Sequence, residues 1–304
     1  MSVEVGIVLR ETDLGQRRND LASLTATIAD AGIDHATVGD HVSFAGGHGV
    51  DGLIQAAALL ASHPALRVQT GVYLLALRHP ATVARQLATI ALMAPGRFTL
   101  GIGVGGDDPR ELELCGVDPR TRGARTSEAL ELVQALLSGD EVSYRGRFFE
   151  VEDAAIRPAP EPAIPVLVGG RSDAALERAG RLGDGWLALW VSPRRFATAI
   201  ELVDAAARRA DRRRDGWRHT LQLWAGFGSS RERAVGTIQP VIERSYGLAF
   251  ERFERYTPCG RPDDVAAAIE PYLAVGCRRF NFVPEAGDVD AGIEAVAAVK
   301  RLLG

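Results

Sequence analysis

Short apolar segments alternate with amphipathic segments along almost the whole of this 304-residue chain. A brief apolar run predicts a buried strand, and apolar residues three and four positions apart predict a helix. Most of the strand-like runs are followed by a helix-like segment, and this alternation favours an α/β fold with parallel strands. The eight predicted strands cover residues 3–9, 34–38, 66–75, 97–103, 164–168, 183–189, 221–227 and 278–283.

Eight strands that alternate with helices fit a (β/α)8 TIM barrel, and we predict a single barrel domain over residues 1–304. A doubly wound sheet is the alternative, but its glycine-rich dinucleotide fingerprint should follow the first strand, where Gly6 stands alone. Residues 228–257 are too many for a simple turn, so we predict an insertion after strand seven. Residues 142–151 have the pattern of a hairpin.

The composition argues against several classes of function. A formal net charge of −4 does not favour a nucleic-acid partner. No apolar run approaches the roughly 20 residues that span a membrane, and the N-terminus does not resemble a signal peptide, so we expect a cytoplasmic protein. Lys300 is the only lysine, which argues against Schiff-base and P-loop chemistry. Cysteines, histidines and carboxylates show no metal-ligand spacing, so we expect no metal.

The active site of a (β/α)8 barrel lies at the carboxyl ends of its strands, where Asp40 and His41 follow the second predicted strand. A histidine can exchange a proton near neutral pH, and a neighbouring carboxylate can tune or orient it. A histidine that only forms hydrogen bonds within its loop is the other interpretation. The dipeptide alone does not decide between them.

Glycines mark two further candidate sites. Gly71 interrupts the third strand, where a glycine indicates a bulge, the close approach of a ligand, or packing under a helix. Gly103, Gly105 and Gly106 end the fourth strand, and their backbone amides can point at an anion or a ring edge. A flexible loop is the alternative there, and the spacing is not that of a Rossmann fingerprint.

Gly169, Gly170, Arg171 and Ser172 connect the fifth strand to a helix that begins near Asp173. Free amides at a helix N-terminus bind phosphate, and Arg171 and Ser172 can add a charge and a hydroxyl. An ordinary turn with Ser172 as the N-cap is the alternative. Barrel phosphate sites usually follow strands seven and eight, whereas this one would follow strand five.

In their order along the chain, these motifs resemble the bacterial luciferase-like superfamily. That superfamily contains flavin-dependent monooxygenases and coenzyme F420-dependent dehydrogenases and reductases. Each piece is short, but the ordered series covers nearly the whole chain. The matching pieces are residues 38–41, 70–72, 78–80, 94–97, 100–105, 122–125 with Glu128, 165–170 and 183–186.

The resemblance implies a barrel with an extended insertion after strand seven. It also implies that Asp40 and His41 face the reacting end of the cofactor, and that a cis peptide bond between Gly71 and Val72 backs a deazaflavin ring. The glycines after strands four and five would bind the cofactor's phosphate. The expected cofactor-binding set is Asp40, Thr70, Gly71, Val72, Gly103, Gly105, Gly106, Gly169, Gly170, Arg171 and Ser172.

Three functions follow from these expectations. The first is an F420-dependent oxidoreductase, in which hydride passes between the deazaflavin and a small organic substrate while His41, helped by Asp40, moves the proton. The second is an FMN-dependent monooxygenase that uses O2 and reduced flavin from a separate reductase. The third is a barrel that binds a cofactor without turnover. Because members of the superfamily are commonly dimers, the resemblance also suggests a homodimer.

One departure concerns the substrate. The F420-dependent sugar-phosphate dehydrogenases that the chain resembles carry a glutamate acid where Gly106 aligns, and they use a lysine for the substrate phosphate. The sequence offers neither group at those places. Sugar-phosphate oxidation is therefore not expected.

Overall fold

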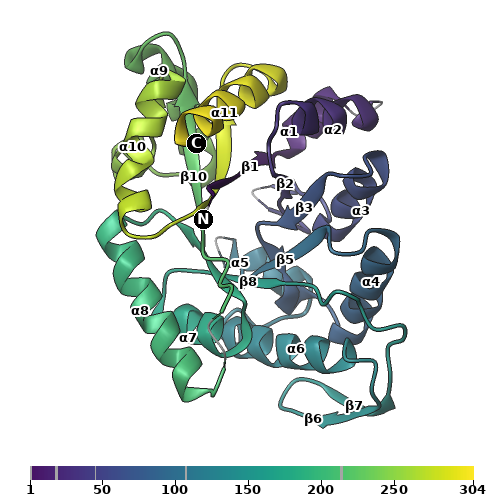
Figure 1. Cartoon of the computed structure of the whole chain (residues 1–304). Coiled ribbons are helices and arrows are strands. Elements are labelled where there is room, and N and C mark those ends of the chain that lie inside the picture. The colour runs from purple at the N-terminus through teal and green to yellow at the C-terminus, as the bar shows by residue number, and fades with distance from the viewer. Residues whose placement is uncertain (1, 18–19, 45, 107, 213–214) are drawn as a thin grey trace.

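The computed structural model describes residues 2–17, 20–44, 46–106, 108–212 and 215–304. Its main sheet is parallel, and the pairings of β9 with β10 and of β12 with β1 close it into a barrel (Figure 1). The predicted (β/α)8 barrel is therefore confirmed. In order around the barrel the strands are β1 (Glu4–Leu9), β2 (His35–Val38), β3 (Arg67–Thr70), β5 (Phe98–Gly103), β8 (Val166–Gly169), β9 (Gly185–Leu189), β10 (Thr220–Phe227) and β12 (Arg279–Glu285).

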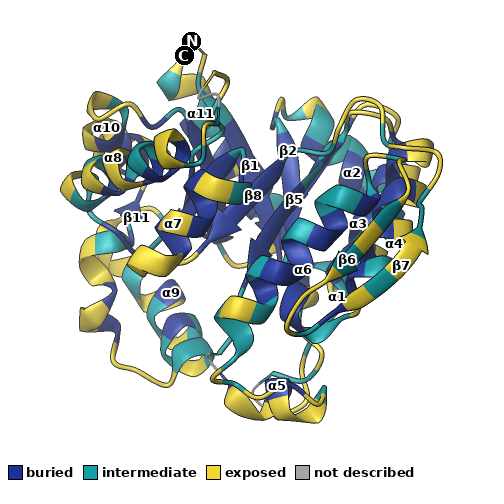
Figure 2. Ribbon diagram, turned by 90° about the horizontal axis from the view of Figure 1, so that it is seen from below, coloured by how far each residue is buried: buried dark blue, intermediate teal, exposed yellow. Residues whose placement is uncertain are grey.

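Helices cover the outside of the barrel, and Figure 2 shows the strands as its buried centre. Several helices begin at a proline, which suits the first turn because no amide is needed there. Two short helices, α1 (Glu11–Gln16) and α5 (Pro109–Leu114), follow β1 and β5. The longer helices between the barrel strands and after β12 are α2 (Leu21–Asp30), α3 (Gly52–Ser62), α4 (Pro80–Met93), α6 (Arg122–Leu136), α7 (Asp173–Leu182), α8 (Pro193–Arg209), α10 (Pro262–Ala274) and α11 (Val289–Leu303).

Alternate residues of the strands face these helices and form most of the core, because side chains of a strand point to opposite faces in turn. Phe280 and Phe282 of β12 and Leu221 of β10 are at most 2% exposed. They belong to the same buried cluster as Ile269 of α10 and Ile293 of α11. The apolar runs of the sequence therefore correspond to strands that are buried on their outer face by helices.

The third strand is interrupted where the sequence predicts a break. β3 ends at Thr70, and the chain resumes as β4 (Tyr73–Leu74) and the 3-10 helix η1 (Leu75–Leu77). Both β3 and β4 pair with β5, so they act as one strand of the barrel. The peptide bond between Gly71 and Val72 is cis, as the resemblance implies, and its place behind a cofactor ring stays a prediction.

Two segments of the chain lie outside the alternation of barrel strands and helices. The predicted hairpin is confirmed as β6 (Val142–Arg145) and β7 (Glu150–Ala154), which pair antiparallel. Between β10 and the short strand β11 (Cys259–Gly260), residues 228–257 hold α9 (Arg231–Tyr246), η2 (Phe250–Arg252) and η3 (Glu254–Tyr256). Figure 2 places α5 and α9 at the end of the barrel opposite the chain termini.

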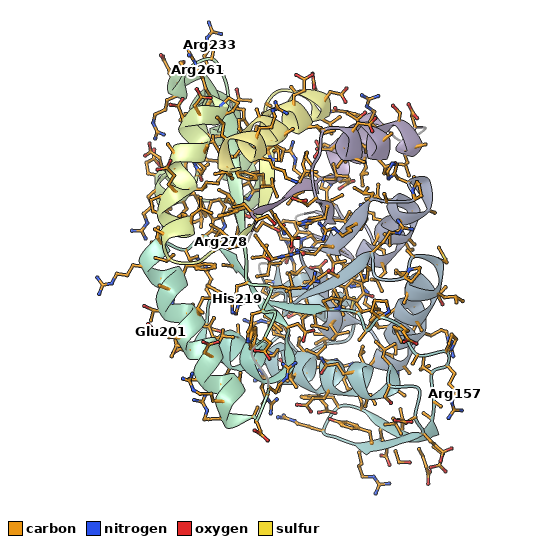
Figure 3. The ribbon with its side chains drawn as sticks, in the orientation of Figure 1. Arg157, Glu201, His219, Arg233, Arg261 and Arg278 are labelled. Carbon is orange, nitrogen blue, oxygen red and sulfur yellow. The ribbon has the colours of Figure 1, made fainter. Side chains whose placement is uncertain are left out.

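Many charged side chains lie on the periphery of the molecule. Figure 3 shows Glu201 on α8 and Arg157 near the β6–β7 hairpin, both pointing away from the barrel. No helix in the described ranges has the length and apolar character needed to cross a bilayer. Among the same residues, no cluster of histidine, cysteine and carboxylate side chains could hold a metal ion.

Helices α7 and α8 approach closely at Gly180, and we predict that Gly180→Ala destabilises the fold. A Cβ atom at this position would lie 2.6 Å from Cβ of Ala206 and would also collide with the carbonyl of Val203. The expected loss is about 1–3 kcal/mol in the free energy of unfolding, the usual cost of overpacking. Urea unfolding measures it.

Gly236 of α9 is the matched control, because it is also helical and a Cβ there meets no atom within 4 Å. Gly236→Ala should leave stability unchanged or raise it by about 0.5–1 kcal/mol. Equal stabilities of the two variants would show that the contact between α7 and α8 tolerates an added methyl group.

Candidate functional site

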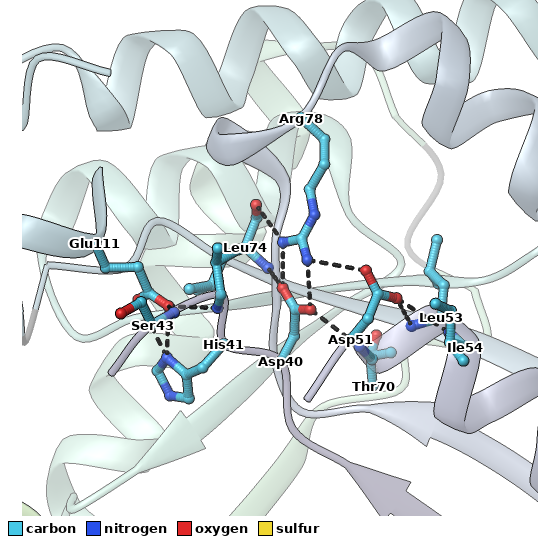
Figure 4. A network of polar contacts seen from close by, with 12 residues as sticks. Asp40, His41, Ser43, Asp51, Leu53, Ile54, Thr70, Leu74, Arg78 and Glu111 are labelled. Atoms are coloured by element: carbon cyan, nitrogen blue, oxygen red, sulfur yellow. Dashed lines mark hydrogen bonds and ion pairs between the residues drawn. The ribbon is translucent and has the colours of Figure 1, made fainter. Parts of the chain in front are cut away.

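Asp40 follows β2 and is 2% exposed, and its carboxylate ties three elements together (Figure 4). Its two oxygens accept hydrogen bonds from the amides of Gly52 and Leu74, each at 2.9 Å. They also accept two bonds from the guanidinium of Arg78, at 2.5 and 2.8 Å. Arg78 donates a further bond of 3.1 Å to Asp51, the N-cap of α3. The network therefore joins the loop after β2 to α3 and β4.

The charge state of this network follows from its geometry. Four donors point at the two oxygens of Asp40, an arrangement that suits an ionised carboxylate, which only accepts hydrogen bonds. Burial would lower the pKa of Arg78 and raises the pKa of Asp40, but the charge and hydrogen bonds of Asp40, together with Tyr73 and Asp51, raise the pKa of Arg78. The pair is thus a buried salt bridge with a structural role.

The carboxylate beside His41 belongs to Glu111 of α5 and not to its sequence neighbour Asp40. In the described part of the chain, the hydrogen bonds and ion pairs of Asp40 go to Gly52, Leu74 and Arg78. Nδ1 of His41 lies 3.1 and 3.3 Å from the two oxygens of Glu111. Asp40 therefore positions the loop that carries His41, and it does not contact the imidazole.

Glu111 is held rigidly for this contact. Its side chain is 3% exposed, and one of its oxygens accepts bonds from the amides of Val42 at 2.6 Å and Ser43 at 3.0 Å. The His41 ring stacks on Phe44 with 4.5 Å between ring centroids. Because an ionised carboxylate can only accept, Nδ1 is the donor of this contact, and in the tautomer that it selects Nε2 is the acceptor. The His41 side chain is 37% exposed, so a ligand can reach it.

The interruption of strand three is enclosed by glycines of the neighbouring strands. A Cβ at Gly103 of β5 would collide with the Val72 side chain, and one at Gly169 of β8 would lie 2.9 Å from Cγ1 of Val72. Both glycines are therefore needed for Val72 to pack. Thr70 is fully buried, and its hydroxyl exchanges two 2.8 Å hydrogen bonds with the backbone of Gly101. Thr70 thus lies inside the barrel wall, behind the surface of the site.

Gly105, Gly106 and Gly170 have φ values of +64°, +113° and +121°, a conformation that favours glycine. A Cβ at Gly106 would lie 2.7 Å from Nε of Arg122, the first residue of α6. That Nε atom is buried and has no hydrogen-bond partner among the described residues. Arg122 was not a predicted site residue, although residues 122–125 contributed to the resemblance. A basic side chain therefore lies against the predicted phosphate loop.

Arg171 and Ser172 lie at the start of α7, as predicted. The Ser172 hydroxyl accepts a 3.3 Å hydrogen bond from the amide of Ala175, so it is the N-cap of α7. Arg171 is exposed, and its carbonyl accepts a bond from Arg195. The sequence left a phosphate site and an N-cap as alternatives for Ser172; the structure shows the N-cap, and the phosphate site stays a prediction.

Residues 5–278 match the family model described as luciferase-like monooxygenase. The chain belongs to this family. Membership of this family makes the chain a luciferase-like oxidoreductase. Its relatives include the F420-dependent glucose-6-phosphate dehydrogenases of Beutenbergia cavernae, at 30% identity over 91% of both chains, and of Nakamurella multipartita, at 28% identity over 87% of this chain and 86% of the relative.

Solved structures agree on the fold. An F420-dependent secondary alcohol dehydrogenase in complex with an F420–acetone adduct superimposes with a TM-score of 0.85, at 20% identity and with 98% and 99% of the two chains covered. The monooxygenase RslO1 of Streptomyces bottropensis superimposes with a TM-score of 0.81, at 22% identity and with 98% and 97% covered. The luciferase-like barrel thus carries both types of chemistry.

We predict that Asp40→Asn lowers the free energy of unfolding by about 3–5 kcal/mol, because it leaves a largely buried guanidinium without its main counter-charge. The Arg78 side chain is 17% exposed and the Asp40 side chain is fully buried. Denaturant unfolding of both proteins measures the difference.

Asp118→Asn is the matched control, since Asp118 also pairs with an arginine, Arg120, but at the surface. It should unfold at the same denaturant concentration as the parent chain. If Asp40→Asn behaved like this control, the salt bridge would not hold the loop.

Proposed function

We propose that this luciferase-like oxidoreductase uses coenzyme F420 and transfers a hydride between the deazaflavin and a small organic substrate. The observation that carries the proposal is the His41 imidazole, which a buried glutamate orients at the carboxyl end of the barrel. A histidine held in this way can take up or release the proton that accompanies hydride transfer. The relatives named as F420-dependent dehydrogenases support the choice of cofactor.

The residues at the rim fit a cofactor with a flat ring and a phosphate. Backbone at Gly71 and Val72 would form the floor for the ring, with Val72 fixed in the space left by Gly103 and Gly169. The phosphate would lie between two loops of positive φ and two helix N-termini, those of α6 and α7. The residues proposed to hold it are Gly105, Gly106, Gly169, Gly170, Arg171, Ser172 and, in addition, Arg122.

When bound, the deazaflavin supplies the hydride chemistry, and the chain supplies proton transfer and orientation. Nε2 of His41 would accept the hydroxyl proton of an alcohol substrate, or donate a proton in the reverse direction. Glu111 would keep Nδ1 protonated and the ring in place. The salt bridge between Asp40 and Arg78 would hold the loop that carries His41 in place. This division of roles replaces the predicted pairing of His41 with Asp40.

We propose that the substrate is not a sugar phosphate held by a lysine, although several relatives are named for glucose 6-phosphate. Lys300 lies on α11, where its ammonium group binds the Gly32 carbonyl at 2.6 Å and Asp34 at 2.7 Å. Asp34 precedes β2, so this lysine is at the amino end of the barrel, opposite His41. The glycine at position 106 removes a second group that the sugar-phosphate dehydrogenases would use.

An FMN-dependent monooxygenase is the second candidate, since the family model and the RslO1 structure are both named as monooxygenases. Glycine-rich phosphate loops serve either cofactor, and a separate reductase would then supply reduced flavin. The relatives that are enzymes argue against a barrel without turnover. A homodimer and a cytoplasmic location stay predictions.

Parallel binding titrations with F420 and FMN test the proposal. We expect tight quenching of F420 fluorescence and weak binding of FMN by the purified chain. Tight FMN binding without F420 binding would move the chain to the oxygen-dependent type. Product formation that requires both O2 and reduced FMN would establish the second candidate.

We predict that His41→Ala lowers kcat by roughly 10²-fold or more, the usual contribution of a general acid–base residue. Glu111→Gln should lower kcat by roughly tenfold with less effect on F420 affinity, because it removes the orienting charge and keeps the imidazole. Steady-state kinetics with the best substrate from an alcohol and ketone panel measures both effects.

Glu113→Gln on the same short helix is the matched control and should retain full activity, since its side chain is exposed. Full activity of Glu111→Gln as well would rule out an orienting role for that carboxylate. Full activity of His41→Ala would require another proton donor.

A further inference from the structure

The inside of the barrel is unusually polar on one side. Five inward-facing residues, from four strands, carry amide, hydroxyl or imidazole groups, whereas barrel interiors are mostly filled by branched apolar side chains. Register places them as neighbours: Thr37 lies opposite Gln69, and Gln222 lies opposite Asn281. The fifth residue, His35, is two positions before Thr37 on β2. The interior set is His35, Thr37, Gln69, Gln222 and Asn281.

Gly6 of β1 gives this set room to meet across the barrel. β1 lies between β2 and β12, and Gly6 is level with both His35 and Asn281. A side chain at Gly6 would collide with the His35 ring. Because glycine has no side chain, there is room for the His35 ring, and its Nε2 atom lies 2.7 Å from Oδ1 of Asn281. A direct hydrogen bond therefore joins two members of the interior set, His35 and Asn281.

Most of the remaining polar atoms of the interior set lack partners. Nδ1 of His35, Oγ1 of Thr37, both amide atoms of Gln69, Oε1 of Gln222 and Nδ2 of Asn281 are buried and form no hydrogen bond with any described residue. Four of the five side chains belong to residues that are at most 4% exposed. Buried polar groups in folded proteins almost always have partners, since leaving them unpaired costs free energy. A donor and acceptor small enough to serve several of them at once is water.

The interior set extends up to the floor of the proposed cofactor site. A Cβ at Gly71 would lie 2.8 Å from Oε1 of Gln222 and 2.6 Å from Cγ2 of Thr37. These two residues are therefore directly beneath the backbone at Gly71. At the other end, burial and the nearby charge of Arg279 lower the pKa of His35 to about 4, so its ring is neutral near pH 7 and can both donate and accept.

We propose that the barrel interior binds a cluster of ordered water molecules, held by His35, Thr37, Gln69, Gln222 and Asn281, that reaches the underside of Gly71. Each water would bridge groups on different strands, so the cluster ties β2, β3, β10 and β12 together from within. A role of the water cluster in supporting the cofactor's ring depends on the proposed function. The presence of the bound water does not depend on it.

Magnetic relaxation dispersion of water ¹⁷O on the whole purified chain, without cofactor, tests the water site. The method counts water molecules that stay bound for longer than the protein takes to tumble. We expect such waters in the parent chain and fewer of them in Gln69→Leu, which removes two of the unpartnered atoms. Gln239→Leu on α9, outside the barrel, is the matched control and should keep the parent's number.

Thr37→Val provides a second variant of nearly unchanged shape in case Gln69→Leu does not fold, and it should also lose bound water. A crystal structure locates the molecules: ordered water within hydrogen-bond distance of Gln69 and Asn281 is the expected result. Equal counts in the variants and the parent, or a dry interior whose side chains bond one another, would overturn the proposal. Failure of F420 to bind would refute the proposed function and leave this result unaffected.

Discussion

The salt bridge between Asp40 and Arg78 is the contact on which the rest of the site depends. It joins the end of β2, the start of α3 and the segment after β4, three pieces of chain that form one side of the barrel's carboxyl end. Removing two charges from water is costly, so a buried pair contributes more to a defined arrangement than to net stability. Here the arrangement includes the residue next to Asp40, which is His41. The position of the imidazole is therefore a consequence of a charge pair that it does not touch.

A second constraint is close packing around Val72. Its side chain fills the space that Gly103 and Gly169 leave open, so strands β3, β5 and β8 meet at one valine. Close packing of this kind admits little change of volume. The glycines that a sequence motif associates with phosphate thus fall into two groups. Gly103 and Gly169 are required by packing, whereas Gly105, Gly106 and Gly170 are required by backbone conformation.

Much of the fold could be predicted because buried parallel strands are continuously apolar, and all eight barrel strands were found within a few residues of their ends. Helix α8 was not predicted, although its buried residues Phe196, Ala199, Val203 and Ala206 recur at the three- and four-residue spacing of an amphipathic helix. Helix α9 lay within residues that were recognised only as an insertion. There, Gly236 and Pro240 obscure the helical pattern.

The site was predicted less completely, and distance along the chain is the reason. Asp40 and His41 are adjacent, so a local pattern suggested that they act together. The true partner of His41, Glu111, is 70 residues away and reaches it only because β5 and its following loop lie on the same rim. Arg122 was visible within a matching motif, but its contact with Gly106 needed the folded chain.

Helix α5, which carries Glu111, is only six residues long and lies in the connection between β5 and α6. His41 and Glu111 thus come from two separate loops, after β2 and after β5, and the proposed phosphate loop after β8 contributes neither of them. Gly105 and Gly106 precede α5 in that same loop, so an exchange of the whole loop would alter the proposed phosphate site together with the carboxylate beside His41, whereas substitutions confined to α5 would leave those glycines in place.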